Sequence, residues 1–190
     1  MGMKQTIEVL NRMEADGVIG RYCITGAVAA FYYIEASTTE DLDILVSFED
    51  MPGHPKSGLL TLGPILSYLG GLGYSQFLKE GLVIEQWPVQ FLPVANDLDT
   101  EALQSAEEVT IELEDGDVKT RLLRPEHVVA NALRAARPKD RFRVLQFLES
   151  EAVEVSVLCP VLERHGLAAT LAEFCRSAGL ANPCMVKSKP

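Results

Sequence analysis

Histidine and cysteine are scarce in this 190-residue chain, which contains three histidines and four cysteines. No two cysteines form a C-x-x-C pair, and the sequence has no cluster of the side chains that hold zinc, so a structural zinc site is excluded. We expect all four cysteines to be buried as small hydrophobic side chains. They are Cys23, Cys159, Cys175 and Cys184.

Basic residues are also few, since 17 Lys and Arg face 27 Asp and Glu, giving a net charge of −10 and a pI near 4.8. A general nucleic-acid binder usually carries a basic face. A polyanionic ligand of this chain must therefore be held by a few specific cations or by a metal ion. No apolar run reaches the ~18–20 residues of a membrane span. Residues 1–11 lack the apolar stretch of a signal peptide, so we expect a cytoplasmic protein that does not bind membranes.

What the chain does contain is ordinary globular material, with 47% hydrophobic and 23% charged residues. Helical and strand periodicities alternate along it, which predicts an α/β fold with a small mixed sheet flanked by helices. Expected helices are 5–16, 27–34, 59–69, 100–106, 125–136 and 138–148, with helical structure again over 153–178. Expected strands are 22–24 and 41–46, with hairpins 82–85/89–92, turning at Trp87 and Pro88, and 109–113/118–123. A loop is expected over 50–57.

Two carboxylates stand out on the strand over 41–46. Asp41 and Asp43 alternate with Leu42 and Ile44, so both aspartates point to one side of the strand. Aspartate is disfavoured in strands, and two on one side repel each other. A divalent cation would explain the pair, because carboxylate oxygens suit Mg²⁺ or Mn²⁺, which are often shared with phosphates. The alternative is that both aspartates are solvated residues of an edge strand.

A strand, a turn at Gly26, a helix and then Asp-x-Asp resembles the nucleotidyltransferase superfamily, and more closely the small bacterial proteins related to AbiEii toxins. The resemblance extends from residue 17 to about 148. It implies a nucleotidyltransferase-like domain over 1–150, followed by a C-terminal helical segment and tail over 151–190. It also implies an NTP as ligand, Mg²⁺ at Asp41 and Asp43, a toxin–antitoxin context and a cognate antitoxin. The nucleotide contacts it suggests are the amides of Gly26 and Ala27, and Thr39 in the turn before the strand.

In these relatives a later helix carries a basic pattern, which here is Arg134, Arg137, Lys139, Asp140 and Arg143. Lys139 and Arg143 are four residues apart and share a helix face. On that face they are candidates to bind the triphosphate or an acidic RNA backbone. The alternative is a solvated basic face that pairs with surplus acids.

Two positions depart from the family pattern. Ala27 stands where active enzymes often have Ser or Gly, and the triplet Val89-Gln90-Phe91 places an amide where a third carboxylate is usual. An amide cannot act as a base. If Trp87-Pro88 is the whole hairpin loop, Glu85 pairs with Gln90 and is a candidate substitute. The alternative for Glu85 is a solvent-facing side chain.

Two main functions follow. The first is Mg²⁺- or Mn²⁺-dependent transfer of a nucleotidyl group to a protein hydroxyl, a tRNA end or a small molecule, with Asp41, Asp43 and Glu85 as the catalytic candidates. The second is a catalytically silent nucleotidyltransferase fold that binds a nucleotide or a protein. A third hypothesis is a subunit that assembles, for example with another copy, through the apolar C-terminal helices.

Overall fold

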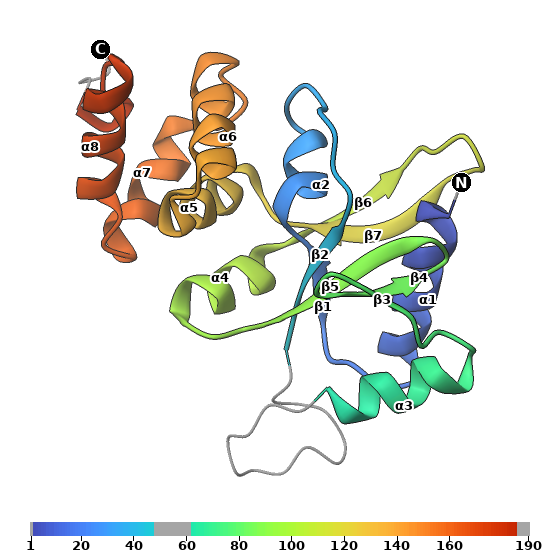
Figure 1. Cartoon of the computed structure of the whole chain (residues 1–190). Helices are drawn as coiled ribbons and strands as arrows, with labels where there is room; N and C mark the ends of the chain where they lie inside the picture. The colour runs from blue at the N-terminus through green and yellow to red at the C-terminus, as the bar shows by residue number, and fades with distance from the viewer. Residues whose placement is uncertain (1, 48–61, 186–190) are drawn as a thin grey trace. The chain divides into compact units, whose positions relative to one another are not determined.

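The computed structural model describes residues 2–47 and 62–185 of the chain (Figure 1). The chain divides into two compact units, the first made of Met1–Ala29 and Ser37–Leu123, the second of Ala30–Ala36 and Arg124–Pro190. The sequence placed this division at residue 150. It lies earlier because the helix after Leu123 packs on the helices that follow it rather than ending the first unit.

The first unit is built on a seven-stranded sheet with the order β3-β4-β5-β2-β1-β7-β6 (Figure 1). β2 pairs with β5 and β1 with β7 in parallel, and the other neighbours are antiparallel. The predicted α/β class with a mixed sheet is therefore confirmed. The strands are β1 Tyr22–Ile24, β2 Leu42–Val46, β3 Phe77–Leu78, β4 Gly81–Ile84, β5 Trp87–Pro93, β6 Glu107–Ile111 and β7 Val118–Leu122.

Helices α1 Met3–Ala15, α2 Gly26–Phe31, α3 Gly63–Gly71 and α4 Asp97–Ser105 follow the predicted order. α1 buries Ile7, Leu10 and Met13 as its apolar spacing predicts. α4 begins before the predicted residue 100, because the side chain of Asn96 accepts a hydrogen bond from the backbone amide of Asp99 in the first turn. The loop predicted over 50–57 lies outside the described residues, as does the start of the helix predicted over 59–69.

The β4–β5 hairpin turns at Glu85 and Gln86, not at Trp87 and Pro88. Ile84 pairs with Trp87, and Glu85 and Gln86 both have positive φ, 48° and 76°. Positive φ at both loop residues is the type I′ geometry, whose twist matches that of the strands. The predicted register is therefore wrong, because the loop lies two residues earlier in the chain than predicted. Pro88 lies within β5.

The second unit contains four longer helices, α5 Pro125–Ala135, α6 Pro138–Glu149, α7 Val155–Arg164 and α8 Ala168–Ala178, and the short helix η1 Pro183–Met185. α5 contacts α6, α7 and α8. The helical stretch expected over 153–178 is broken at Gly166, which has φ +68°. No described helix has the length and apolar character needed to cross a membrane.

Two cysteines depart from the expectation of buried free thiols. Cys159 of α7 and Cys184 of η1 form a disulfide that ties the end of the described chain to α7. Cys23 and Cys175 are free and buried, as expected. A pairing across 25 residues cannot be inferred from spacing alone, because the fold brings the two side chains together.

Candidate functional site

The two aspartates of the Asp-x-Asp motif lie at the start of β2. Asp41 directly precedes the strand and Asp43 is its second residue, so their side chains leave the same side of the chain. Parallel pairing of β2 with β5 sets Asp43 opposite Gln90. All three side chains are partly exposed. The structure thus brings together the three positions that the sequence pattern singled out on neighbouring strands.

The carboxylate of Asp41 accepts hydrogen bonds from neutral groups. Gln90 Nε2 donates to Asp41 Oδ2 over 3.1 Å, and Thr39 Oγ1 lies 3.2 Å from Asp41 Oδ1. The same hydroxyl also lies 3.2 Å from the backbone oxygen of Asp41. These donors orient the carboxylate and leave its negative charge in place.

Gly26 allows the turn before α2 to lie directly against Asp43. Its φ is +63°, which L-residues with a side chain rarely adopt. A Cβ at this position would meet Asp43 Oδ2 at 2.2 Å. The neighbouring amide of Thr25 donates to the backbone oxygen of Asp43 over 2.9 Å. The glycine of the motif is thus required by backbone conformation and by the closeness of a carboxylate.

The oxygen donors at this site fit Mg²⁺ or Mn²⁺ bound together with a phosphate ligand. Asp41 and Asp43 supply carboxylates, and each carboxylate oxygen can accept more than one interaction. Among the described residues, no group of three or more His, Cys, Asp or Glu is arranged to hold a metal ion. Mg²⁺ is commonly held by one or two carboxylates with substrate phosphates and water completing its shell, so two aspartates suffice for such a site.

Glu85 lies away from this group. Gly81 stands opposite Gln90 when the β4–β5 pairing is extended, and Glu85 is four residues further along, about 13 Å at the spacing of a strand. Its carboxylate accepts a hydrogen bond from the hydroxyl of Tyr74, a contact that raises the pKa of Tyr74 to about 12. The register predicted from the sequence, which would place Glu85 beside Gln90, is not formed.

Lys139 and Arg143 belong to α6 of the second unit, whereas Asp41 and Asp43 belong to the first. Lys139 is exposed. Arg143 is not, since its side chain is 11% exposed and its Nη1 donates to Asp140 Oδ1 over 3.1 Å. Arg137 donates to the other oxygen of Asp140. The structure therefore gives Arg143 a partner inside its own unit.

A cation that the sequence reasoning missed belongs to the first unit. Lys79 is in the two-residue loop between β3 and β4, and its Nζ donates to Glu40 Oε2 over 2.7 Å. Glu40 directly precedes Asp41 in the chain. Nothing in the sequence pattern marked Lys79, because a two-residue strand such as β3 leaves no periodic signal.

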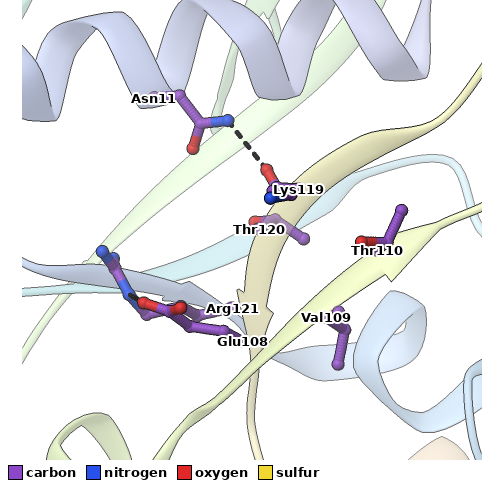
Figure 2. Close-up of a pocket in the computed structure, with 7 residues that line it drawn as sticks. All are labelled: Asn11, Glu108, Val109, Thr110, Lys119, Thr120 and Arg121. Carbon is purple, nitrogen blue, oxygen red and sulfur yellow. Dashed lines mark hydrogen bonds and ion pairs between the residues drawn. The ribbon is translucent and has the colours of Figure 1, made fainter.

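A second polar region of the first unit surrounds a hollow of about 450 Å³ beside α1 and the β6–β7 hairpin (Figure 2). It contains none of the residues singled out from the sequence. Its lining residues are Asn11, Glu108, Val109, Thr110, Lys119, Thr120 and Arg121.

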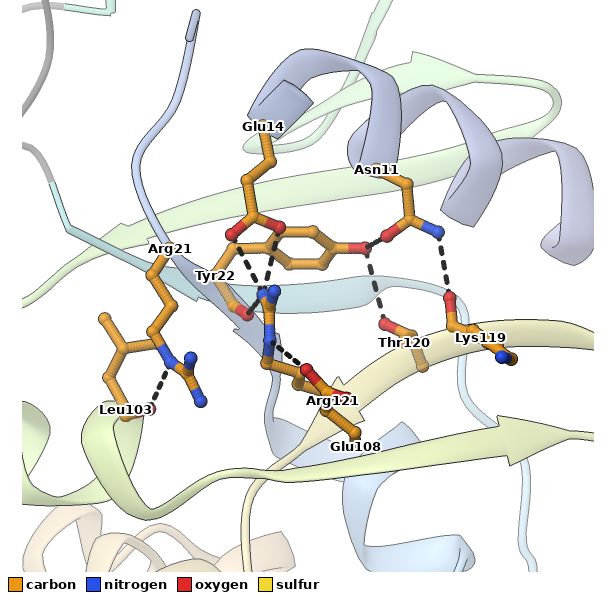
Figure 3. Close-up of polar contacts among 9 residues, drawn as sticks. All are labelled: Asn11, Glu14, Arg21, Tyr22, Leu103, Glu108, Lys119, Thr120 and Arg121. Carbon is orange, nitrogen blue, oxygen red and sulfur yellow. Dashed lines mark hydrogen bonds and ion pairs between the residues drawn. The ribbon is translucent and has the colours of Figure 1, made fainter. Parts of the chain in front are cut away.

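The charges around this hollow are largely used within the protein (Figure 3). Arg121 Nη1 donates to both carboxylate oxygens of Glu14, over 3.0 and 2.9 Å, and to the backbone oxygen of Tyr22 over 3.1 Å. The Tyr22 hydroxyl donates to Asn11 Oδ1 over 2.6 Å, and burial raises the pKa of Tyr22 to about 12. These bonds fasten α1 to β1 and β7, so we assign this region a structural role.

No family model matches the sequence, and the search of curated proteins also gave no match. Among solved structures, the chain is similar to an antigenic nucleotidyltransferase-like protein from Paracoccidioides brasiliensis, at 16% identity over 90% of this chain and 92% of that chain, with a TM-score of 0.47. It is also similar to the antibiotic-resistance factor ANT(2″)-Ia in solution, at 15% identity over 94% of this chain and 95% of that chain, with a TM-score of 0.43.

A crystal structure of ANT(2″)-Ia in complex with adenylyl-2″-tobramycin is 17% identical over 91% of this chain and 96% of that chain, with a TM-score of 0.40. These identities and TM-scores are too low to assign an activity to this chain.

Proposed function

We propose that this chain is a nucleotidyltransferase-like protein that binds a nucleoside triphosphate together with Mg²⁺ or Mn²⁺ at Asp41 and Asp43. The observation that carries the proposal is the contact group at the start of β2. Two aspartates lie on one side of the chain, a positive-φ glycine packs against one of them, and a polar residue of the parallel strand β5 donates to the other.

The metal ion would be held by the carboxylates of Asp41 and Asp43. When bound, it would neutralise negative charge on the phosphates of the nucleotide. The amides of Gly26 and Ala27 and the hydroxyl of Thr39 are the further phosphate contacts that we propose. α2 has only six residues, so its dipole adds little, and the metal must supply most of the attraction.

The side chains of the site favour nucleotide binding without efficient transfer of the nucleotidyl group. Gln90 occupies the place of a third carboxylate and donates to Asp41 rather than accepting a proton. An amide cannot serve as a general base, and Glu85 is too distant along the hairpin to replace it. A nucleotide-binding module is therefore our leading function.

Nucleotidyl transfer is the second candidate, favoured by the retained pair Asp41 and Asp43. Its acceptor would be a protein hydroxyl, a tRNA end or a small molecule. We also propose two protein partners: a cognate antitoxin, from the sequence resemblance, and a second copy of the chain, from the apolar C-terminal helices.

The test of binding is calorimetry with each NTP in the presence of Mn²⁺. We expect the wild type to bind, Asp43→Asn to bind at least tenfold more weakly, and Asp117→Asn to match the wild type. Asp117 is an exposed aspartate in the loop before β7, so its substitution makes the same change of charge elsewhere. Equal affinity of all three proteins would exclude this site.

The test of transfer uses NTPs labelled at the α-phosphate with total cell RNA and protein as acceptors. Label that becomes covalently attached with the wild type and not with Asp43→Asn would establish the second candidate. Nucleotide binding without label transfer would establish the first.

A further inference from the structure

The loop between β3 and β4 holds a lysine in a backbone conformation that lysine rarely adopts. Leu78 pairs with Gly81, so Lys79 and Glu80 form the whole loop, and Lys79 has a φ of 55°. Two-residue hairpin loops need positive φ at this position, where glycine, asparagine and aspartate are preferred. A lysine here gives up some backbone stability, and such residues are concentrated where the side chain has a function.

The ammonium group of Lys79 is directed toward the acidic end of β2. Its Nζ is 2.7 Å from Glu40 Oε2, and both side chains are mostly exposed, at 70% and 73%. The hydrogen bond and charge of Glu40 raise the pKa of Lys79, with a smaller attraction from Asp41. The ammonium therefore stays charged at neutral pH and is within the electrostatic reach of Asp41.

Sheet register explains how a hairpin loop comes so close to β2. Leu78 pairs with Gly81, and Leu82 pairs with Val89, which sets Gly81 level with Gln90. Gln90 in turn pairs with Asp43. The loop of the β3–β4 hairpin is thus level with Gln90 of β5 and Asp43 of β2.

We propose that Lys79 binds the phosphate chain of the nucleotide, exchanging its contact with Glu40 for a phosphate oxygen. This inference rests on the proposed function, because it assigns a ligand contact at that same site. A lysine ammonium is a compact charge on a flexible stem and suits phosphate binding. Exchange is favoured because an exposed ion pair is weak, whereas a polyphosphate brings several negative charges.

Lys79 also removes the need for a cation from the second unit. Lys139 and Arg143 were the phosphate-binding cations expected from the sequence, and Arg143 is engaged with Asp140. With Lys79, the first unit carries carboxylates for a metal ion and a cation for phosphate within one body. The ion pair with Glu40 would hold Lys79 near the site when no nucleotide is bound.

Two substitutions, Lys79→Ala and Glu40→Gln, each break the ion pair between Lys79 and Glu40. Their effects on nucleotide affinity distinguish phosphate binding by Lys79 from a purely structural role of the pair. If Lys79 binds phosphate, Lys79→Ala raises the Kd for Mn²⁺–NTP about tenfold, as expected for a lost charge-assisted hydrogen bond. Glu40→Gln leaves the Kd unchanged or lowers it, because it frees Lys79 and removes a negative charge. If the pair were only structural, both variants would change the Kd in the same direction.

The control variant is Lys119→Ala, which removes an exposed lysine from β7 in the same unit. It should bind nucleotide as the wild type does. Lys79→Gly adds a test independent of folding, because glycine suits the positive φ: we expect an unchanged or higher Tm together with the same tenfold weaker binding. A ligand series of NTP, NDP and nucleoside should show the loss for the two phosphorylated ligands and not for the nucleoside.

The outcomes distinguish this inference from the proposed function. If the wild type binds no NTP with Mn²⁺, both fail. If the wild type binds and Asp43→Asn weakens binding, while Lys79→Ala and Lys79→Gly bind as the wild type does, the proposed function stands and the role of Lys79 is overturned. An equal loss in Lys119→Ala would also overturn it, because the effect would then come from net charge.

Discussion

Asp140 and Asp41 show how differently two aspartates of one chain can be used. Asp140 of α6 is 1% exposed, and two arginines of the second unit, Arg137 and Arg143, donate to its carboxylate. Asp41 of the first unit is partly exposed and accepts from the neutral groups of Thr39 and Gln90. One carboxylate has its charge balanced by cations of its own unit, whereas the other is oriented by neutral donors.

The difference separates a structural charge from one suited to bind an external ligand. A buried carboxylate must be paired, because an unpaired buried charge is strongly unfavourable. A partly exposed carboxylate beside a second one remains stable in water, and a divalent cation lowers its repulsion. Arg137 and Arg143 of the basic pattern therefore balance a buried carboxylate of their own unit, and the Asp-x-Asp pattern at the start of β2 is the better candidate for ligand binding.

The largest effect that would test this comparison is the loss of Asp140. We expect Asp140→Ala to lower the free energy of unfolding by about 3 kcal/mol, because it leaves Arg143 largely buried without this carboxylate. Lys139→Ala, one residue earlier and exposed, should change it by less than ~0.5 kcal/mol. Denaturant titration measures both. A small, equal effect of the two substitutions would mean that Asp140 has no special structural role.

The next effect concerns the glycine beside Asp43. Gly26→Ala and Gly17→Ala both place a side chain at positive φ, which costs about 1 kcal/mol. Only at Gly26 does the new Cβ collide with a carboxylate, since nothing lies within 4 Å at Gly17. We expect Gly26→Ala to lower the free energy of unfolding by about 2–3 kcal/mol in total and also to weaken Mn²⁺ binding, as measured by denaturation and calorimetry. Equal losses would show that Asp43 moves aside easily.

A third test uses a buried group that is neutral at physiological pH. Burial raises the pKa of Tyr22 to about 12 from 10.0. The contribution of its protonated hydroxyl to the free energy of unfolding is therefore complete below pH 10 and is lost as the pH rises toward 12. The expected loss is about 2–3 kcal/mol. Tyr22→Phe removes this group and should show a smaller decrease over the same interval, although it is about 1 kcal/mol less stable at pH 7. Parallel curves would contradict the assignment.

Much of the fold could be predicted from local patterns. The strict alternation of Asp41, Leu42, Asp43 and Ile44 predicted β2 and the shared side of the aspartates. Helices α5 and α6 begin at the predicted residues, Pro125 and Pro138, because proline is favoured at the first position of a helix. These features depend on neighbouring residues, so the sequence contains the information directly.

What failed depended on contacts between distant residues or on turn geometry. The sequence predicts the β4–β5 loop at Trp87 and Pro88, because proline is typical of turns, whereas Glu85 and Gln86 adopt the positive φ of the loop with no glycine to signal it. The pairing of Cys159 with Cys184 and the contact of Lys79 with Glu40 likewise arise only after folding. Arg143 was expected to bind phosphate because a helix pattern does not reveal which carboxylate its arginine contacts.

The smallest expected change in stability, and the sharpest test of the comparison, is Gln90→Glu. This substitution keeps the shape of the side chain and replaces the Nε2 donor to Asp41 with an acidic oxygen. Without metal, repulsion should lower the free energy of unfolding by less than about 1 kcal/mol. With a third carboxylate present, affinity for Mn²⁺ should rise about tenfold, because a divalent ion is attracted by each added negative charge.

The matched control is Gln86→Glu, which adds the same charge in the exposed loop of the β4–β5 hairpin. If Asp41 is oriented for a cation, only Gln90→Glu gains affinity in calorimetry, and label transfer from an NTP appears or increases if the missing acid alone limits the reaction. If both variants bind Mn²⁺ as the wild type does, the carboxylates of β2 are not a cation site. The contrast between Asp41 and Asp140 would then be a difference of burial alone, since the partly exposed Asp41 would need neither an arginine nor a metal ion.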